Sequence, residues 1–323
     1  MTTDLDQIRP FQVVRAVRAL VAGPRTADDV AAAAGVAPAQ LPQILTALAR
    51  HGVRTEKHSG AYRLQAPYDL LDSARVTAAL GDLAPDLVIN LLEQCASTNS
   101  EVLNAPPRSG HVTVCELQSA GRGRRGRVWH SGLGDGLTFT LGWRFARPAS
   151  SLSALSLCVG IALVTALERL GVDELALKWP NDVLLRQRKL AGTLIEIRSV
   201  EGGDYWVAIG VGLNVRVPPA VGAEAIGLAE VVADRPSRNE LLASLLVELA
   251  GEMTRFAADG FAPVRHRWLT RHAWNGRRVQ VGGGADVAVG VVAGVSDDGA
   301  LELNTEAGMQ RIYQGELSLR LAP

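Results

Sequence analysis

The sequence predicts an α+β protein built from three parts. We expect an N-terminal winged helix-turn-helix, a central α/β domain with a mixed, mostly antiparallel sheet, and a small C-terminal β-barrel. Residues 11–50 have helical periodicity, residues 86–272 alternate between helix and strand patterns, and residues 277–321 change to short strands rich in Val and Gly. A chain of 323 residues is long enough for all three parts.

The N-terminal part, residues 1–66, has the pattern of three helices followed by a β-hairpin. Thr26 and Asp29 have the spacing of a capping box, and Gly35 supplies a turn before the third helix. Pro42 would remove an intrahelical hydrogen bond unless that helix begins near Leu41. The expected elements are helices at 11–21, at 27–34 and up to residue 50, and strands at 53–57 and 61–64.

A connector, residues 67–85, leads to the central domain, residues 86–272, and the barrel follows at residues 273–323. Helices of the central domain are expected at 91–103, 152–170, 238–258 and 261–271, on one side of the sheet. Its strands are expected at 112–117, 136–143, 175–178, 183–186, 190–197 and 205–214. The barrel strands are expected at 277–281, 287–295, 301–304, 310–313 and 317–319.

Composition excludes several classes of protein. Lys plus Arg equals Asp plus Glu, at 33 each, which argues against a protein that coats nucleic acid. The N-terminus lacks the apolar segment of a signal peptide, and the apolar stretch 152–167 is short for a membrane span and predicts a buried helix. Cys95, Cys115 and Cys158 are far apart and predict buried, reduced thiols in a cytoplasmic protein. The six histidines, at 51, 58, 111, 130, 266 and 272, lack metal-ligand spacing.

The most informative segment is QSAGRGRRGRVW, residues 118–129, which contains a GxGxxG pattern at Gly121, Gly123 and Gly126. In a dinucleotide-binding fold such a loop opens a helix whose N-terminus meets a pyrophosphate. Here four arginines stand among the glycines and would repel one another on the positive first turn of a helix. The segment therefore predicts a loop, whose glycines allow close approach and whose arginines contact phosphate or carboxylate oxygens. A solvated basic loop has the same composition.

Four further motifs surround this loop: STN at 97–99, KWPND at 178–182, RKLAG at 188–192 and GVGLN at 210–214. In this order they resemble the biotin–protein ligase family, most specifically over about residues 90–215. The resemblance extends more weakly to the winged helix and to GELSLR at 315–320, which looks like the family's closing strand. It implies an SH3-like barrel and the layout of the bifunctional class, whose members also repress biotin-synthesis genes.

The resemblance implies a biotin–[acetyl-CoA-carboxylase] ligase. ATP and biotin would be its substrates, with Mg²⁺, and biotinyl-5′-AMP would be the intermediate. The acceptor would be a lysine of a biotin carrier protein of the acetyl-CoA carboxylase type. A homodimer and operator DNA as a second partner are implied as well.

The biotin ureido ring needs hydroxyl and amide partners rather than charge, and Ser97, Thr98 and Gln118 match the family positions that bind it. An ordinary helix cap is the alternative role of the STN motif. Gly192, Gly210 and Gly212 would let the strand backbones approach the biotin bicycle. The residues assigned to biotin are Ser97, Thr98, Asn99, Gln118, Arg122, Gly123, Arg124, Lys189 and Gly192.

Lys189 matches the lysine beside the biotin carboxylate and the α-phosphate, where a cation stabilises charge as carboxylate oxygen attacks phosphorus. Lys189 and Arg124 are the expected catalytic residues. Asp182 is the expected Mg²⁺ ligand, because an ATP-bound metal needs a hard oxygen. The resemblance assigns the adenylate to Arg124, Arg127, Trp129, Asn181 and Asn214, with Trp129 stacked on adenine.

Residues 1–66 contain eight Lys or Arg and five Asp or Glu, a mildly basic balance that suits a DNA backbone. The third helix begins without a basic residue, so the candidates for DNA contacts are Gln40, Gln43, Thr46, Arg54, Lys57 and His58. A winged helix that does not bind DNA is the alternative.

Two other functions stay open. A lipoate–protein ligase shares the catalytic fold, but its pocket would take a dithiolane, whereas Ser97, Thr98 and Gln118 favour a ureido ring. A biotin-sensing transcription regulator without catalysis would have no use for Lys189, Arg124 and Asp182.

Overall fold

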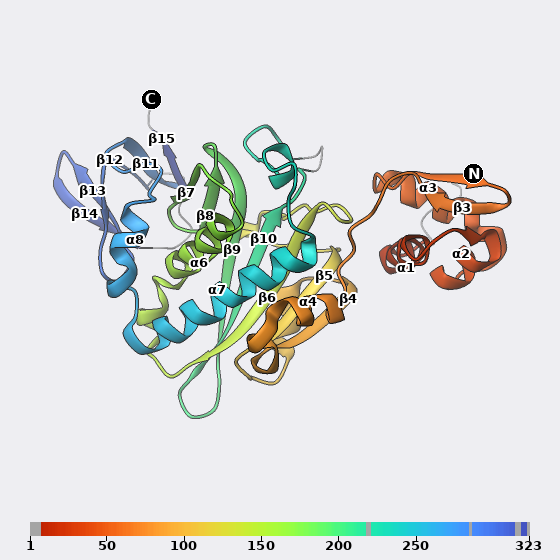
Figure 1. The fold of residues 1–323 in the computed structure, drawn as a ribbon. Coiled ribbons are helices and arrows are strands. Elements are labelled where there is room, and N and C mark those ends of the chain that lie inside the picture. Colours follow the sequence, from red (N-terminus) through yellow and green to blue (C-terminus); the bar gives the residue numbers. More distant parts are fainter. Residues whose placement is uncertain (1–7, 218–220, 284–285, 314–317, 322–323) are drawn as a thin grey trace.

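The structure is a computed structural model that describes residues 8–217, 221–283, 286–313 and 318–321. An N-terminal module of helices lies at one end, a body built on a seven-stranded sheet follows, and a five-stranded sheet lies at the opposite end (Figure 1). The predicted α+β class is confirmed. The N-terminal residues 1–7 and residues 315–317 of the GELSLR motif lie outside the described residues.

The N-terminal module contains α1 (Pro10–Val21), α2 (Ala27–Ala34), α3 (Leu41–Arg50), β1 (Arg25–Thr26), β2 (Thr55–His58) and β3 (Ala61–Leu64). Its antiparallel sheet has the order β1-β3-β2. Thr26 Oγ1 accepts a hydrogen bond from the Asp29 backbone N–H, and the Asp29 carboxylate accepts one from the Thr26 backbone N–H, each at 3.2 Å, so the capping box is confirmed. Because α3 begins at Leu41, Pro42 lies in the first turn, where no intrahelical bond is lost.

The central sheet has the strand order β4-β5-β6-β10-β9-β8-β7. The strands are β4 (Val88–Cys95), β5 (His111–Gln118), β6 (Gly136–Phe145), β7 (Leu175–Lys178), β8 (Asp182–Leu185), β9 (Arg188–Ser199) and β10 (Tyr205–Asn214). Only β4 and β5 run parallel among these neighbours, so the predicted mixed, mostly antiparallel sheet is confirmed.

The prediction that the helices cover one side of this sheet is wrong. Helices α6 (Leu155–Arg169) and α7 (Arg238–Asp259) pack on the face that carries Val207, Ile209 and Val211. Helix α5 (Thr98–Asn104) covers the other face, where Trp206 and Ala208 pack against Val102. Successive residues of β10 point to opposite faces and are apolar or glycine on both, which indicates a strand covered on both sides.

The predicted helix at residues 91–103 is also wrong in its first half. Val88–Cys95 is strand β4, which pairs with β5 from Val88 opposite His111 to Cys95 opposite Gln118. The apolar residues of this segment suit a helix as well as a strand, and pairing with β5 decides between them. The helix is α5, and it begins only at Thr98.

The C-terminal sheet has the order β14-β13-β12-β11-β15, and all its pairs are antiparallel. Its strands are β11 (Arg278–Gly283), β12 (Asp286–Val295), β13 (Leu301–Thr305), β14 (Gly308–Ile312) and β15 (Ser318–Leu321). Val279, Val292 and Leu301 belong to the same buried core as the central sheet, so this sheet packs directly on the body through α8 (Arg265–Leu269) and its neighbours. The SH3-like barrel and the domain boundaries stay predictions.

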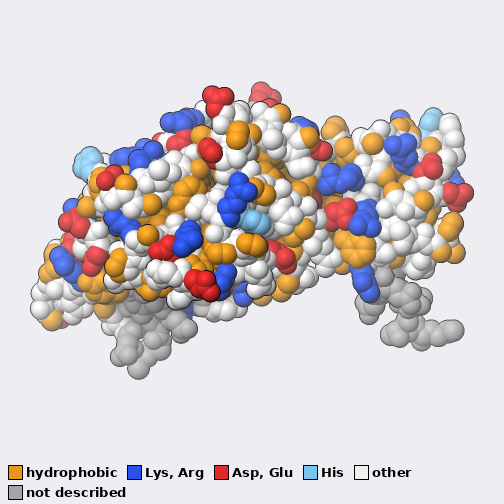
Figure 2. Space-filling view, turned by 90° about the horizontal axis from the view of Figure 1, so that it is seen from below, with side chains coloured by type: hydrophobic (Ala, Val, Ile, Leu, Met, Phe, Trp, Pro, Cys, Tyr) orange, Lys and Arg blue, Asp and Glu red, His pale blue; other side chains and the backbone are white. Residues whose placement is uncertain are grey.

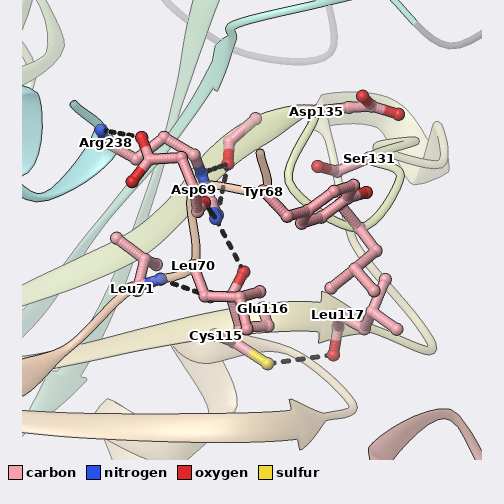
Figure 3. Close-up of polar contacts among 12 residues, drawn as sticks. Tyr68, Asp69, Leu70, Leu71, Cys115, Glu116, Leu117, Ser131, Asp135 and Arg238 are labelled. Carbon is pink, nitrogen blue, oxygen red and sulfur yellow. Dashed lines mark hydrogen bonds and ion pairs between the residues drawn. The ribbon is translucent and has the colours of Figure 1, made fainter. Parts of the chain in front are cut away.

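A buried clamp fastens the connector to the body (Figure 3). The Arg238 guanidinium donates 2.8 Å hydrogen bonds to Glu116 Oε2 and to the Gly136 carbonyl, and one of 2.9 Å to the Asp69 carbonyl. Glu116 Oε1 accepts from the Leu71 backbone N–H at 2.6 Å. This connector leads into α4 (Ser73–Leu80), which packs on α7, so the clamp and α4 together fix the connector on the central domain.

Burial agrees with the expectations from composition. The expectation that the apolar stretch 152–167 is short for a membrane span is wrong, because among the described residues the helical segment Ala149–Arg169 is long and apolar enough to cross a membrane. However, 78% of its apolar segment is buried inside the protein, as predicted for a core helix. A second stretch qualifies only if α2 and Pro38–Arg50, bent by 94°, count as one. All three cysteines are free and buried, as predicted. On the face seen in Figure 2, basic and acidic side chains are interspersed.

Candidate active site

A cavity of about 890 Å³ opens at one edge of the central sheet. Strands β5, β7 and β10 end there and β6, β8 and β9 begin there, because neighbouring strands are antiparallel. Residues remote in sequence therefore reach the same space. Every residue assigned to biotin, adenylate or Mg²⁺ lines it: Ser97, Thr98, Asn99, Gln118, Arg122, Gly123, Arg124, Arg127, Trp129, Asn181, Asp182, Lys189, Gly192 and Asn214.

One part of the cavity wall is polar and uncharged. Gln118 Oε1 accepts a hydrogen bond of 2.9 Å from the backbone N–H of Thr98. The Thr140 hydroxyl lies 2.8 Å from the Thr98 hydroxyl and 2.7 Å from Asn99 Oδ1. Ser97 precedes α5, but its side chain makes no capping hydrogen bond, so the helix-cap alternative does not use its hydroxyl. Hydroxyl and amide groups here can bind a neutral polar ring.

Another part of the wall carries cations around the Asp182 carboxylate. Lys189 Nζ lies 2.7 Å from Asp182 Oδ1 and 5.9 Å from the centre of the Trp129 ring. Arg124 donates to Asn181 Oδ1 at 3.5 Å. Burial lowers the pKa of Arg124, and the nearby Asp182 charge opposes that shift. This part can stabilise a phosphate or carboxylate group.

Lys178 also lines the cavity, although the sequence reasoning did not select it. Its Nζ lies 4.4 Å from the centre of the Trp274 ring. Burial lowers the pKa of Lys178, Asp182 opposes the shift, and Lys189 adds to it. As the first residue of the KWPND motif it had a signal in the sequence. Leu319 also lines the cavity and lies in the GELSLR motif, whereas no motif marks Trp274 or Thr140, whose positions depend on tertiary structure.

The strand glycines make room for side chains of the site itself. A Cβ on Gly212 would lie 2.3 Å from the Trp129 ring, and one on Gly210 would lie 2.2 Å from Asn99 Oδ1. At Gly192 a Cβ would lie 3.0 Å from Lys189 Nζ. We expected these glycines to admit the biotin bicycle, whereas here they seat Trp129, Asn99 and Lys189 against the sheet.

The Gly/Arg loop, residues 119–130, folds over the cavity without opening a helix. It contains the short turn Arg124–Gly126 and an antiparallel bridge between Arg122 and Val128, and the Trp129 N–H donates to the Gly121 carbonyl at 2.9 Å. The choice of a loop over a dinucleotide-binding helix is confirmed. The Trp129 indole Nε1 is buried and has no hydrogen-bond partner within the described part of the chain, so a residue that lines the cavity carries an unused buried donor.

The remaining candidates lie outside the cavity. Gln40 Oε1 accepts from the Ala37 N–H at 3.1 Å, the Thr46 hydroxyl donates to the Pro42 carbonyl at 2.9 Å, and Lys57 Nζ lies 5.4 Å from the Tyr62 ring centre. Gln43 is partly buried on α3, and Arg54 and His58 are exposed beside and on the hairpin. In the ranges that the structure describes, no three His, Cys, Asp or Glu side chains gather as a metal site.

Trp179 of the KWPND motif also lines the cavity, but its ring is buried and its indole N–H donates to the Gly299 carbonyl at 3.2 Å, which is a packing contact.

Comparison with known proteins gives a family. Residues 91–214 match the Biotin/lipoate A/B protein ligase family, and residues 276–320 match the Biotin protein ligase C terminal domain. The Bifunctional ligase/repressor BirA of Escherichia coli is 34% identical over 268 residues, which cover 81% of this chain and 82% of that protein. The chain belongs to the biotin protein ligase family.

Other family members extend the likeness. The Biotin--[acetyl-CoA-carboxylase] ligase of Paracoccus denitrificans is 36% identical, with 70% of this chain and 98% of that protein covered. The biotin protein ligase from Aquifex aeolicus, solved in complex with biotin and ATP, has a TM-score of 0.64 at 28% identity and covers 72% of this chain and 99% of its own. These relatives agree with the family that the motifs indicated.

Proposed function

We propose that this chain is an ATP-dependent biotin protein ligase that forms biotinyl-5′-AMP and transfers biotin to a lysine of a carrier protein in the cytoplasm. The observation that carries the proposal is the cavity, where a neutral polar wall and a cationic wall meet in one space. Biotin has a neutral ureido ring at one end and a carboxylate at the other. The cavity therefore offers each end of biotin a partner of suitable chemistry.

In the first step, a biotin carboxylate oxygen attacks the α-phosphorus of ATP, the bond to the bridging oxygen breaks, and pyrophosphate leaves. Lys189 and Arg124 are the catalytic residues that offset the negative charge of this step. Ser97, Thr98, Asn99 and Gln118 hold the ureido ring. Trp129, Asn181, Asn214 and Arg127 contact the adenylate, and Lys178 adds a cation for the phosphates.

In the second step, the neutral amine of the carrier lysine attacks the carbonyl carbon of the mixed anhydride. An amide forms, AMP leaves, and the amine loses a proton. The loop, residues 119–130, excludes water from the anhydride until the carrier arrives.

Mg²⁺ bound to ATP fits the site only in part. Asp182 offers one carboxylate, which is ion-paired with Lys189 at 2.7 Å. Glu224 also lines the cavity, but no three His, Cys, Asp or Glu side chains of the described residues gather as a metal site. Mg²⁺ usually keeps several waters and is held through one or two carboxylates plus substrate phosphates. Asp182 would supply one oxygen to a metal that ATP brings, where the metal would shield phosphate charge.

The decisive experiment is incubation with ATP, Mg²⁺, biotin and a biotin carrier domain, followed by a streptavidin blot and a pyrophosphate assay. We expect label on the carrier and pyrophosphate release that depends on biotin. Label with lipoate instead of biotin would favour a lipoate ligase. Biotin binding without pyrophosphate release would favour a sensor without catalysis.

A second proposal is that the N-terminal module is a winged helix-turn-helix that binds operator DNA and makes the protein a repressor, acting as a homodimer. In support, α2 and the Pro38–Arg50 segment meet at 94°, near the angle typical of helix-turn-helix motifs. Arg54 and Lys57 are exposed beside and on the hairpin. A DNA fragment from upstream of biotin-synthesis genes should be shifted when biotin and ATP are present, with a steep loss of binding as salt rises. A ligase that shifts no fragment at low salt would contradict it.

A further inference from the structure

We propose that Glu196 is a positioning residue for this reaction. Its carboxylate holds the Gly/Arg loop, residues 119–130, against the wall of the cavity through an ion pair with Arg122, and we call this ion pair the latch. The inference rests on the proposed ligase function. It assigns Arg122 to the latch, whereas the sequence assigned it to biotin.

One carboxylate oxygen joins three elements. Glu196 Oε2, on β9, accepts a hydrogen bond of 2.8 Å from Arg122 Nη2 in the loop and one of 2.7 Å from Asn99 Nδ2 in α5. Arg122 Nη2 also donates to Ser100 Oγ at 3.2 Å. On β9, Gly192 and Leu194 line the cavity, and Glu196 follows on the same face, because side chains alternate along a strand. Glu196 thus stands where the loop meets the rim.

From Glu196 a chain of hydrogen bonds continues to the ligand wall. Asn99 Nδ2 also donates to the Leu194 carbonyl at 3.1 Å, and both of its partners only accept, so the amide nitrogen must face them. Asn99 Oδ1 therefore faces Thr140, whose hydroxyl lies 2.7 Å away and leads on to Thr98. Through Asn99, Glu196 sets which atoms the uncharged wall presents to a ligand.

The latch is a weak contact, as expected of a contact that must open in each catalytic cycle. The side chains of Arg122 and Glu196 are 44% and 30% exposed, and ion pairs at such exposure stabilise weakly. Biotin must enter beneath the loop, and the anhydride must then be kept from water. A weak ion pair with fixed partners allows the loop to open for biotin and to close over the anhydride.

The first test needs no substrate. Hydrogen exchange of loop amides 119–130 would be compared in the wild type, Glu196→Gln, Arg122→Ala and the double variant. Each single variant should exchange about two- to fivefold faster, the range expected from loss of one exposed ion pair. The double variant should exchange no faster than the singles, because one contact is lost in all three. A matched control is Asp204→Asn, which breaks the Arg144–Asp204 pair of 2.7 Å at 45% and 21% exposure, and this variant should leave the loop unchanged.

The second test separates positioning from chemistry. Glu196→Gln should raise the KM for biotin and speed release of the adenylate more than it lowers kcat, and Asp204→Asn should change neither. Unchanged loop exchange, or additive effects in the double variant, would overturn the latch. A fall in kcat with KM unchanged would place Glu196 in the chemistry instead. If the wild type forms no adenylate, the ligase proposal fails, while the exchange experiment still decides whether the latch exists.

Discussion

In the cavity, polar side chains find partners far away in the sequence, whereas in the Pro38–Arg50 segment of the N-terminal module they find partners close by. Arg122 bonds to Glu196 across 74 positions and Arg124 to Asn181 across 57. In the module, Gln40 caps Ala37 across three positions and Thr46 bonds to Pro42 across four. Local bonds satisfy polar groups within one segment, and long-range bonds assemble a site. Gln40 and Thr46 therefore use their side chains within their own segment.

The largest effect on the free energy of unfolding is expected at the clamp, which holds the connector between the N-terminal module and the central domain. In the clamp, the Arg238 and Glu116 side chains are 3% and 0% exposed. Glu116→Ala leaves a buried guanidinium without its counter-charge and should lower the free energy of unfolding by about 3–5 kcal/mol. Urea denaturation measures it, with Glu56→Ala as the control, since that variant breaks the exposed Glu56–Arg63 pair of the hairpin. Equal losses in both variants would mean that the clamp is worth no more than a surface pair.

Acid should destabilise the body through His272. Burial lowers the pKa of His272 from 6.5 to about 4, and neither ring nitrogen has a hydrogen-bond partner among the described residues. Because the unfolded chain takes up this proton near pH 6.5, stability is lost as pH falls from there towards pH 4. The loss should reach about 3 kcal/mol.

His272→Phe keeps an aromatic ring against Trp268 and should flatten this dependence in denaturation curves recorded from pH 7 to pH 4.5. The control is His58→Gln in the exposed hairpin, which should retain the acid sensitivity of the wild type. A His272→Phe protein that loses stability in parallel with the wild type would exclude His272 as the cause.

The sequence predicted most elements because their patterns are local. Thr26, Asp29 and Gly35 mark the ends of α2, and Pro42 marks the start of α3. The prediction for residues 88–95 was wrong for the opposite reason. They form strand β4 because they pair with β5, and no residue near them in the sequence indicates that pairing. The face of the sheet that α5 covers could not be predicted for the same reason, since no short-range pattern indicates which face a helix covers.

The residues of the cavity could be predicted from the sequence where the chemistry of a ligand determines the residue type. Arg124, Lys189 and Asp182 stand in motifs, and they meet in one cavity. Glu196 and Thr140 could not be found, because they act on other side chains. The glycines Gly210 and Gly212 were selected for the right property, close approach, but the neighbours that use it became visible only in three dimensions.

At Lys189 we expect a smaller change in free energy than at Glu116, although the change in the catalytic rate is large. Lys189→Ala removes the cation beside Asp182 and should lower kcat for biotin-dependent pyrophosphate exchange by about a hundredfold or more. The control is Lys57→Ala, whose side chain lies on the hairpin, and it should exchange at the wild-type rate. A near-normal rate in Lys189→Ala would remove this residue from the chemistry and weaken the contrast between the two regions.

The smallest effect tests the module itself. If Gln40 serves the fold by capping Ala37, Gln40→Ala should lower the free energy of unfolding by about 1 kcal/mol. Its preference among DNA fragments should not change. Lys57→Ala should instead leave stability alone and reduce the salt dependence of DNA binding by about one phosphate contact. Denaturation and gel shifts at several salt concentrations give both quantities. If Gln40→Ala keeps full stability but loses its preference for one base pair, Gln40 reads DNA directly, and the polar residues of the Pro38–Arg50 segment serve recognition as well as the fold.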